Sequence, residues 1–446
     1  MLTPEFLLRI VEATEEKTAE LNNYVAERIA KRIISLFSKK GKVELIPSSV
    51  LDARKAKETG KLTEEVSQIV EEKLPEIKSE VKKAFVKAAN QIDADNRLFT
   101  QKVVQVELDN GVIQDIELPE LSDYEKSGIP KKIKDLNLTQ KEVRLLERAY
   151  RVTNGTLNNL TRTTALASQR TFIVAVDTAY WKATHGVSIH TAIAEAVEAC
   201  AKEGTYVLYP TGHRDRIEVA VARAVRTGIN QAAGDITLTR CAEMGVNAVI
   251  VSSHAGARYT DKDEPANHMS WQGKVYSIDW NSQALSQYEV TEEEREENKG
   301  IFKFLDRIRI FLNRHQEKTD GDFIAVTGYG TGEGLCGWNC RHSFGPYYKG
   351  ISVNDNKPYD SEEDKRKYDL EQEQRAKERK IRELTRKRNV CRHSMKESED
   401  DVLADEFKEK YQKIQKNLDS ARDSYEDFCQ KNNLKTRQER LKVYQK

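Results

Sequence analysis

The chain has 446 residues, enough for one to three domains, and its 38% hydrophobic and 33% charged residues favour a core in one part and long solvated helices elsewhere. Lysine and arginine total 73 against 72 aspartate and glutamate, so net charge provides no general attraction to nucleic acid or to an anionic membrane. No apolar run approaches the length of a membrane span, and the N-terminus lacks the features of a secretory signal, so we expect a protein kept in a cytosol. Six scattered cysteines without such a signal argue against a disulfide framework.

Helical periodicity dominates the first part of the chain. Thr3 and Pro4 are typical of a helix start. Apolar residues then recur at helical spacing over 21–37 and over 66–85, where Pro75 is expected to kink or break the helix. Residues 103–118 instead alternate, imperfectly in the second arm, around an Asn-Gly pair, which predicts a β-hairpin. The spacing of Val103 and Val106 also fits a helix.

Capping signals mark the helices that follow. Thr139 and Glu142 form a capping box that begins a helical stretch running with breaks to about 182. Ser188 caps a helix that ends before Gly204, and a further helix begins near Asp215 and reaches about 243.

The pattern changes to short apolar runs after residue 247. Residues 248–251, 275–278 and 323–326 are strand candidates, and a capping box at Thr291 predicts a helix to about 313. The composition therefore indicates an α+β region in this part of the chain.

The last part of the chain is highly charged. From Ser361 to about Gln445 the pattern predicts exposed helices, as a helical hairpin or coiled coil that is broken near 394–398. The apolar stripe is thin, so we expect residues 361–446 to be dispensable for folding of the preceding domain. The basic stretch 377–392 can contact phosphates, but equally frequent acidic residues favour a solvated helix face.

Three segments, 252–258, 268–274 and 328–348, concentrate glycine, tryptophan, cysteine, histidine and tyrosine. Glycines permit positive φ and close backbone approach, which predicts a tightly bent loop covered by aromatic side chains. We expect one cluster that ties the late loop onto the sheet, formed by His268, Trp271, Cys340, Arg341 and His342.

Metal binding is an alternative for this cluster. Zinc takes Cys and His ligands, and five residues could supply a tetrahedral site: His254, His268, Cys336, Cys340 and His342. Cys-x3-Cys-x-His is not one of the commoner spacings. We therefore favour packing and hydrogen bonding of these residues, with no cofactor, and keep zinc as the second interpretation.

Catalysis and nucleotide binding have weaker support. A Cys–His hydrolase needs a base within reach of its nucleophile, and no hydrolase signature surrounds Cys340, so we predict no catalytic residues. The glycines of 328–334 lack the lysine and the strand-to-helix context of a phosphate loop.

The order of these segments resembles the phage minor capsid protein 2 family and, more distantly, the Mu F-type head morphogenesis domain. The wider domain's Arg-Thr matches Arg226 and Thr227, and its late Cys-Arg-Cys matches 340–342, where His342 replaces the second cysteine. The residues that carry the resemblance or the expected cluster are Arg226, Arg258, His268, Trp271, Gly273, Trp338, Cys340, Arg341 and His342.

This resemblance implies a structural minor capsid protein of a tailed bacteriophage, present in few copies and acting in head assembly. Its implied partners are the portal protein, the inner capsid and sister copies. Packaged DNA is a further partner, contacted without sequence preference, and no membrane partner is expected. The implied location is the portal vertex of the virion, with the host cytoplasm during assembly, and ejection with the DNA is compatible with it. The alternative is a metal-dependent or Cys/His enzyme delivered to the host.

The expected fold is α+β and predominantly helical. We expect a helical portal- or capsid-docking region over 1–205, a Mu F-like α+β domain with the Gly/Trp/Cys/His loop over 206–355, and a charged, coiled-coil-like tail over 356–446.

Overall fold

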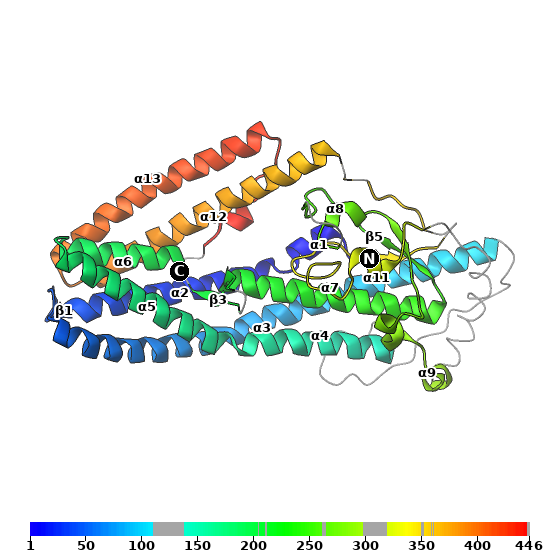
Figure 1. Cartoon of the computed structure of the whole chain (residues 1–446), viewed down its shortest axis with the longest axis horizontal. Coiled ribbons are helices and arrows are strands. Elements are labelled where there is room, and N and C mark those ends of the chain that lie inside the picture. Colours follow the sequence, from blue (N-terminus) through cyan, green and yellow to red (C-terminus); the bar gives the residue numbers. More distant parts are fainter. Residues whose placement is uncertain are drawn as a thin grey trace. The chain divides into compact units, whose positions relative to one another are not determined.

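The computed structural model describes residues 1–109, 138–203, 205–209, 212–260, 265–297, 319–348, 352–357, 359 and 361–443 (Figure 1). The chain forms two compact units, each assembled from three separate segments. Unit 1 contains residues 1–12, 81–154 and 223–369, and unit 2 contains 13–80, 155–222 and 370–446. Each unit thus takes segments from all three of the consecutive regions expected from the sequence.

Unit 2 is built from long helices and two very short hairpins. The elements that belong to it wholly or largely are α2 (Glu12–Phe37), the first half of α3 (Ser48–Asp109), α5 (Leu160–Thr184), α6 (Ile189–Glu203), α12 (Glu362–Glu397), α13 (Asp401–Lys431), the 3-10 helix η3 (Gln438–Leu441), and the pairs β1 (Ser38–Lys39) with β2 (Lys42–Val43) and β3 (Tyr206–Leu208) with β4 (Arg214–Arg216).

The apolar periodicity of the first helices is confirmed. In α2 the side chains of Leu21, Val25, Ile29 and Ile33 are fully buried along one face. The expected break at Pro75 is absent, because α3 continues through this residue as one helix.

The charged tail forms the expected helical hairpin, with a break at residues 398–400 between α12 and α13 (Figure 1). Its expected exposure, however, is wrong. Ile381 and Val390 of α12 and Phe407 of α13 are fully buried, so charged residues surround an apolar face that packs. The tail is therefore part of the core of unit 2.

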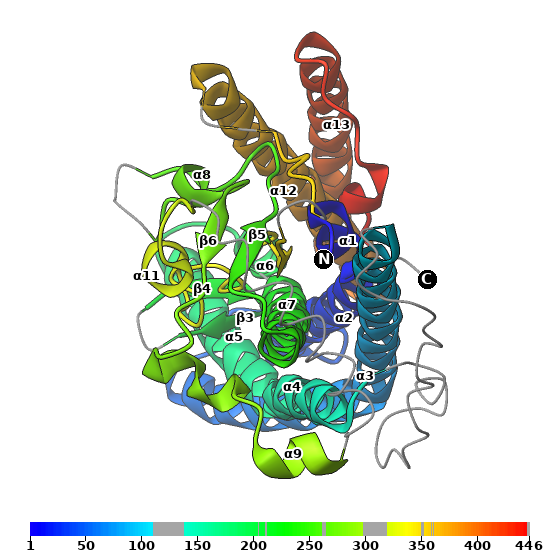
Figure 2. The same cartoon turned by 90° about the vertical axis from the view of Figure 1, so that its right-hand side faces the viewer.

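Unit 1 combines helices with a small sheet. Its elements are α1 (Pro4–Arg9), the second half of α3, α4 (Gln140–Asn158), most of α7 (Ile217–Met244), β5 (Ala248–Val251), α8 (His268–Trp271), β6 (Val275–Ser277), the 3-10 helix η2 (Gln283–Tyr288), α9 (Glu292–Glu297), α11 (Phe323–Thr327) and β7 (Phe344–Pro346). Strands β6, β5 and β7 form an antiparallel sheet in that order, with α8 near the ends of β5 and β6 (Figure 2).

Two strand predictions are confirmed and two are wrong. Residues 248–251 and 275–277 are strands, but 323–327 form helix α11. Asp322 accepts a hydrogen bond from the backbone N–H of Ala325, and Gly328 ends the helix with φ of 59°, so capping overrides the apolar pattern. Residues 103–109 of the expected hairpin continue α3, and 110–118 lie outside the described residues.

The predicted helix starts are confirmed. Thr139 and Glu142 exchange backbone-to-side-chain hydrogen bonds of 2.8 and 3.3 Å, and Thr291 and Glu294 do the same at 3.0 and 3.2 Å. The remainder of the helix expected to reach 313 lies outside the described residues.

The fold is α+β and helix-dominated, as the sequence predicts. Among the residues that the structure describes, no helix is long and apolar enough to span a membrane.

Candidate functional site

The sheet of unit 1 brings the three unusual segments together. Pairing of Val251 with Phe344 places the residues that follow β5 beside those that precede β7. Two further hydrogen bonds join Ser252 to Ser343 at 2.9 and 3.0 Å. Helix α8, which carries His268 and Trp271, lies between β5 and β6 in the chain. The antiparallel register thus explains why residues about seventy positions apart meet.

Three side chains converge at the centre of this region. Cys340 Sγ lies 3.9 Å from Nδ1 of His268 and 3.7 Å from Nδ1 of His342. The three ligand-capable atoms lie within 4.8 Å of one another, and all three residues are buried. The expected cluster is therefore present, with Cys340 between two imidazole rings.

Hydrogen bonds fix which nitrogen of each ring carries the proton. Nε2 of His268 lies 2.8 Å from the carbonyl oxygen of Glu333, and a carbonyl only accepts, so Nε2 donates. Nε2 of His342 lies 3.0 Å from Oε1 of Gln272 and donates in the same way. In each neutral ring Nδ1 then carries the lone pair, and both lone pairs face Cys340.

Gln272 is held in the orientation that this assignment requires. Its Oε1 also accepts from the backbone N–H of His254 at 3.0 Å, and its Nε2 donates to the carbonyl oxygen of Tyr359 at 3.3 Å. Gln272 belongs to no motif that would identify it from the sequence as a functional residue. Its place beside Trp271 in the second unusual segment was the only signal.

Burial determines the protonation of the cluster. It lowers the pKa of His268 to about 4, raises the pKa of the Cys340 thiol to about 11, and holds the pKa of His342 well below its usual range. At neutral pH the metal-free cluster thus holds a protonated thiol and two neutral imidazoles. A Cys–His nucleophile instead depends on a thiolate, which this environment disfavours.

Aromatic packing surrounds the cluster. Trp271 is fully buried, donates from its indole N–H to the carbonyl oxygen of Pro265 at 3.0 Å, and lies edge-on to His342 at 5.0 Å. The hydroxyl of Tyr276 in β6 donates to the carbonyl oxygen of Trp271 at 2.8 Å. Trp271 therefore links α8 to the sheet and covers one side of the cluster.

His268, Cys340 and His342 are called the trio below. Two further residues that the sequence offered as metal ligands, His254 and Cys336, do not belong to it. His254 stacks on His342 with ring centroids 4.3 Å apart, and its Nδ1 lies 2.8 Å from the carbonyl oxygen of Ala255. Cys336 Sγ contacts the carbonyl oxygen of His342 at 3.9 Å. Among the described residues, His268, Cys340 and His342 are the one group of three or more His, Cys, Asp or Glu side chains whose ligand atoms converge.

The arginines of the family pattern donate hydrogen bonds mainly to backbone carbonyl oxygens. Arg258 donates to the carbonyl oxygens of Glu333 and Trp338 at 3.2 and 2.9 Å, and Arg341 donates to that of Gly256 at 3.1 Å. Arg226 of α7 donates to Leu7 O at 3.0 Å and to Asn339 at 3.1 Å.

Asn230, one turn further along α7, is a residue that no sequence pattern identifies. It donates from Nδ2 to the carbonyl oxygens of Cys340 and His342 at 3.3 and 2.8 Å. Together with the arginines it fixes the loop that carries two of the three trio residues.

The remaining pattern residues lie at the edge of the loop. Gly273 has φ of 71°, which a side chain would strain, and Trp338 is 60% exposed with its ring against Gly332. A Cβ on Gly334 would lie 2.2 Å from the carbonyl oxygen of Gly328. The glycines thus permit backbone-to-backbone packing within the protein. This packing accounts for the glycine-rich sequence of 328–334, so no phosphate-binding role is needed to explain it.

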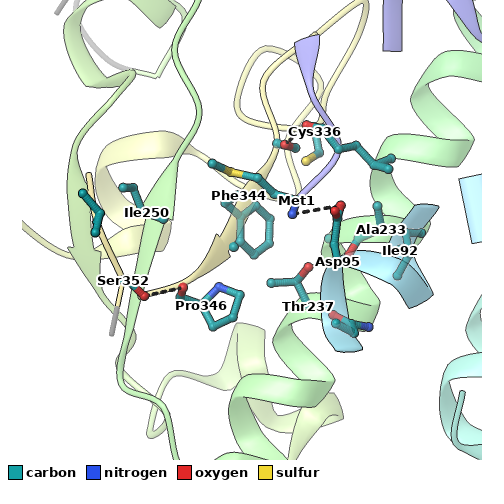
Figure 3. A pocket seen from close by; sticks show the side chains of 16 residues that line it. Met1, Ile92, Asp95, Ala233, Thr237, Ile250, Cys336, Phe344, Pro346 and Ser352 are labelled. Carbon is teal, nitrogen blue, oxygen red and sulfur yellow. Dashed lines mark hydrogen bonds and ion pairs between the residues drawn. The ribbon is translucent and has the colours of Figure 1, made fainter. Parts of the chain in front are cut away.

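A separate cavity of ≈ 220 Å³ lies beside the sheet. Figure 3 shows Met1, Asp95 and Phe344 around it, with an ion pair of 3.1 Å between the amino group of Met1 and Asp95. Cys336 contributes to its lining, but His268, Cys340 and His342 do not. The trio is therefore not a wall of this cavity.

Comparison with known proteins identifies the family of the chain. A family model described as phage minor capsid protein 2 matches residues 2–429 of the chain, which includes segments of both units and the charged tail as far as residue 429. No curated protein and no solved structure matches the chain.

Proposed function

This chain belongs to the phage minor capsid protein 2 family, and from that premise we propose that it docks on the portal and acts there during head assembly. The family match supports a structural role in the capsid of a bacteriophage. The portal as the docking partner, the inner capsid as a second contact and the portal vertex as the location in the virion belong to the proposal.

The observation that carries the proposal is an exposed stripe on α5, in which three large apolar side chains alternate with the exposed Arg170 and Asp177. Leu166, Val174 and Trp181 are 44%, 65% and 59% exposed, although each is a large hydrophobic residue. At about 100° per residue their spacings of eight and seven positions place them within an arc of about 80° on the helix. The stripe runs for about 22 Å, four helical turns, and suits packing against a partner helix.

The contact is tested by co-expression of the full chain with the portal protein of the same phage, followed by size-exclusion chromatography with light scattering. We expect one co-eluting complex. Replacement of Val174 and Trp181 by lysine should abolish it, because two charges would be desolvated at the interface.

Val402→Lys is the matched control, since Val402 is a 57% exposed valine on α13 of the same unit. It should leave the complex intact. A wild-type chain that stays monomeric and never co-elutes, or a double variant that co-elutes as well as wild type, would overturn portal docking through α5.

Non-specific contact with packaged DNA is a secondary part of the proposal. In the basic stretch 377–392, Lys387 binds Glu198 at 3.2 Å and Arg386 is buried. Arg379 and Lys380 are exposed, and Lys380 pairs with Glu383 of the same helix at 3.4 Å. We propose Arg379 and Lys380 as the phosphate contacts. Their double alanine variant should reduce the slope of log affinity against log salt for duplex DNA by about 1 to 2. An unchanged slope would remove DNA as a partner of this stretch.

A further inference from the structure

We infer that His268, Cys340 and His342 form a binding site for a single transition-metal ion of the zinc class. Nothing in the family match assigns such a site, and the inference is independent of portal docking. It rests on the distances among three buried side chains and on the hydrogen bonds that orient them.

The spacing of the three atoms suits a tetrahedral ion. With a metal–sulfur bond of about 2.3 Å and metal–nitrogen bonds of about 2.0 to 2.1 Å, a sulfur and a nitrogen ligand lie about 3.5 Å apart. Cys340 Sγ lies 3.7 and 3.9 Å from the two Nδ1 atoms. The two sulfur–nitrogen distances therefore need to shorten by only a few tenths of an ångström. The two nitrogens lie within 4.8 Å of each other and would close to about 3.3 Å around the ion.

The outer hydrogen bonds are those of metal-bound histidines. A ligating histidine usually donates its second N–H to a carbonyl, a carboxylate or water, which fixes the tautomer and the ring orientation. Nε2 of His268 donates to Glu333 O and Nε2 of His342 donates to Gln272 Oε1. Both rings thus present an unprotonated Nδ1 to the same sulfur.

The thiol proton of Cys340 satisfies the two Nδ1 lone pairs less completely than a bound metal ion would. A thiol has one proton and can satisfy one of the two lone pairs, and at 3.7 to 3.9 Å the contact is long even for sulfur. A buried nitrogen that lacks a donor is costly. A divalent ion that displaces the thiol proton of Cys340 to solvent and binds the thiolate would satisfy both nitrogens and the sulfur together.

The chemistry of the donors selects the ion. Two imidazoles and a thiolate suit borderline-soft zinc and exclude calcium and magnesium, which take oxygen ligands. Three protein ligands leave one position of a tetrahedral ion for a water molecule. Because the ligands come from α8 and from the loop before β7, the bound ion would tie these two segments together.

The first experiment measures metal on the full-length chain, kept reduced with a non-thiol reductant. After purification and addition of Zn²⁺, followed by desalting, elemental analysis should find about one zinc per chain. Added Co²⁺ should give the intense visible bands of tetrahedral cobalt and a sulfur-to-cobalt charge-transfer band. These spectra come from wild-type protein, so they do not depend on whether a variant folds.

Variants then locate the ion. Cys340→Ser should abolish the charge-transfer band, and His342→Gln should lower the zinc content to near zero. Gln272→Ala, which removes only the orienting bond to His342, should weaken zinc affinity about 10- to 100-fold. Cys336→Ser is the control and should retain the ion, since Cys336 lies next to the trio but is outside it.

Three results would overturn the inference. The first is wild-type protein that neither retains zinc nor gives a sulfur-to-cobalt band. The second is a Cys340→Ser variant that still folds and binds the ion as tightly as wild type. The third is loss of the ion in Cys336→Ser, which would show a different ligand set.

Discussion

Arg386 donates from Nη1 to Oε1 of Glu218 at 3.2 Å, across 168 residues of sequence, and the two side chains are only 1% and 4% exposed. Asn22 of α2 donates to the other oxygen of the same carboxylate at 2.8 Å. One buried carboxylate at the start of α7 thus joins the first long helix to the charged tail within unit 2.

Removing the arginine alone should destabilise unit 2. Arg386→Met strands a buried carboxylate, and we expect a loss of about 3 to 5 kcal/mol in the free energy of unfolding. Adding Glu218→Gln should restore most of it, because a neutral amide can still pair with Asn22. Thermal and urea unfolding would measure both. Arg379→Met, at an exposed position of the same helix, is the control. Equal losses of unfolding free energy in Arg386→Met and Arg379→Met would contradict the importance of the buried pair.

Deletion of residues 370–446 should damage unit 2 and not simply remove a solvated tail. Glu198 of α6 accepts from Lys387 at 3.2 Å and from Lys410 at 3.3 Å, and the deletion also uncovers the buried surface under Ile381 and Phe407. Hydrogen exchange in residues 155–222 should become markedly faster. Unchanged protection there would favour the dispensable tail that the sequence predicted.

The two tryptophans of the site should differ sharply in their contribution to stability. Trp271→Ala should lower the free energy of unfolding by about 3 to 5 kcal/mol, because the indole is fully buried. Trp338→Ala should cost much less, since that side chain is 60% exposed. Chemical denaturation of both variants provides the comparison. Similar losses would mean that Trp271 is not the side chain that covers the cluster.

Glu243 should make the protein less stable as the pH rises. Burial first, and then the nearby Glu142, raise the pKa of Glu243 to about 8, against about 4.3 for an unperturbed glutamate. Between these values the folded state holds a proton that the unfolded state has lost, so stability falls from about pH 4.3 up to about pH 8. Glu243→Gln should flatten this fall and raise the melting temperature at pH 8. Glu292→Gln, at an exposed position, should change neither, and a wild-type slope in Glu243→Gln would contradict the assignment.

Two glycines test the packing of the late loop. A Cβ at Gly334 would meet backbone atoms of Gly328 and Thr327 at 2.2 to 2.6 Å, so Gly334→Ala should displace the loop and strongly lower the melting temperature. Gly155 lies inside α4, and a methyl group added there would have no neighbouring atom within 4 Å, so Gly155→Ala should stabilise by up to about 1 kcal/mol. The two substitutions should therefore change the melting temperature in opposite directions. An unchanged melting temperature in Gly334→Ala would contradict the close packing of the loop.

The sequence by itself determined the elements that local chemistry controls. Capping boxes at Thr139 and Thr291 fixed helix starts, because the bonds they make lie within four residues. The apolar stripe of α2 and the strands at 248–251 and 275–277 followed from periodicity alone. The unusual composition around 268 and 340 also identified which residues would meet, since such residue types seldom gather without specific partners.

Tertiary structure decided what depends on distant partners. The third strand of the sheet is β7 and not residues 323–326. Strand pairing depends on the neighbouring strand β5, which is distant in sequence, whereas the caps that make 323–327 a helix lie within the segment itself. The tail is buried because its apolar face packs in unit 2, where Glu218 and Glu198 pair with its basic residues. The sequence of the tail alone does not show which acidic residues those partners are. The direction of the two Nδ1 atoms toward Cys340 likewise arises from Glu333 and Gln272, through hydrogen bonds between segments that only folding brings together.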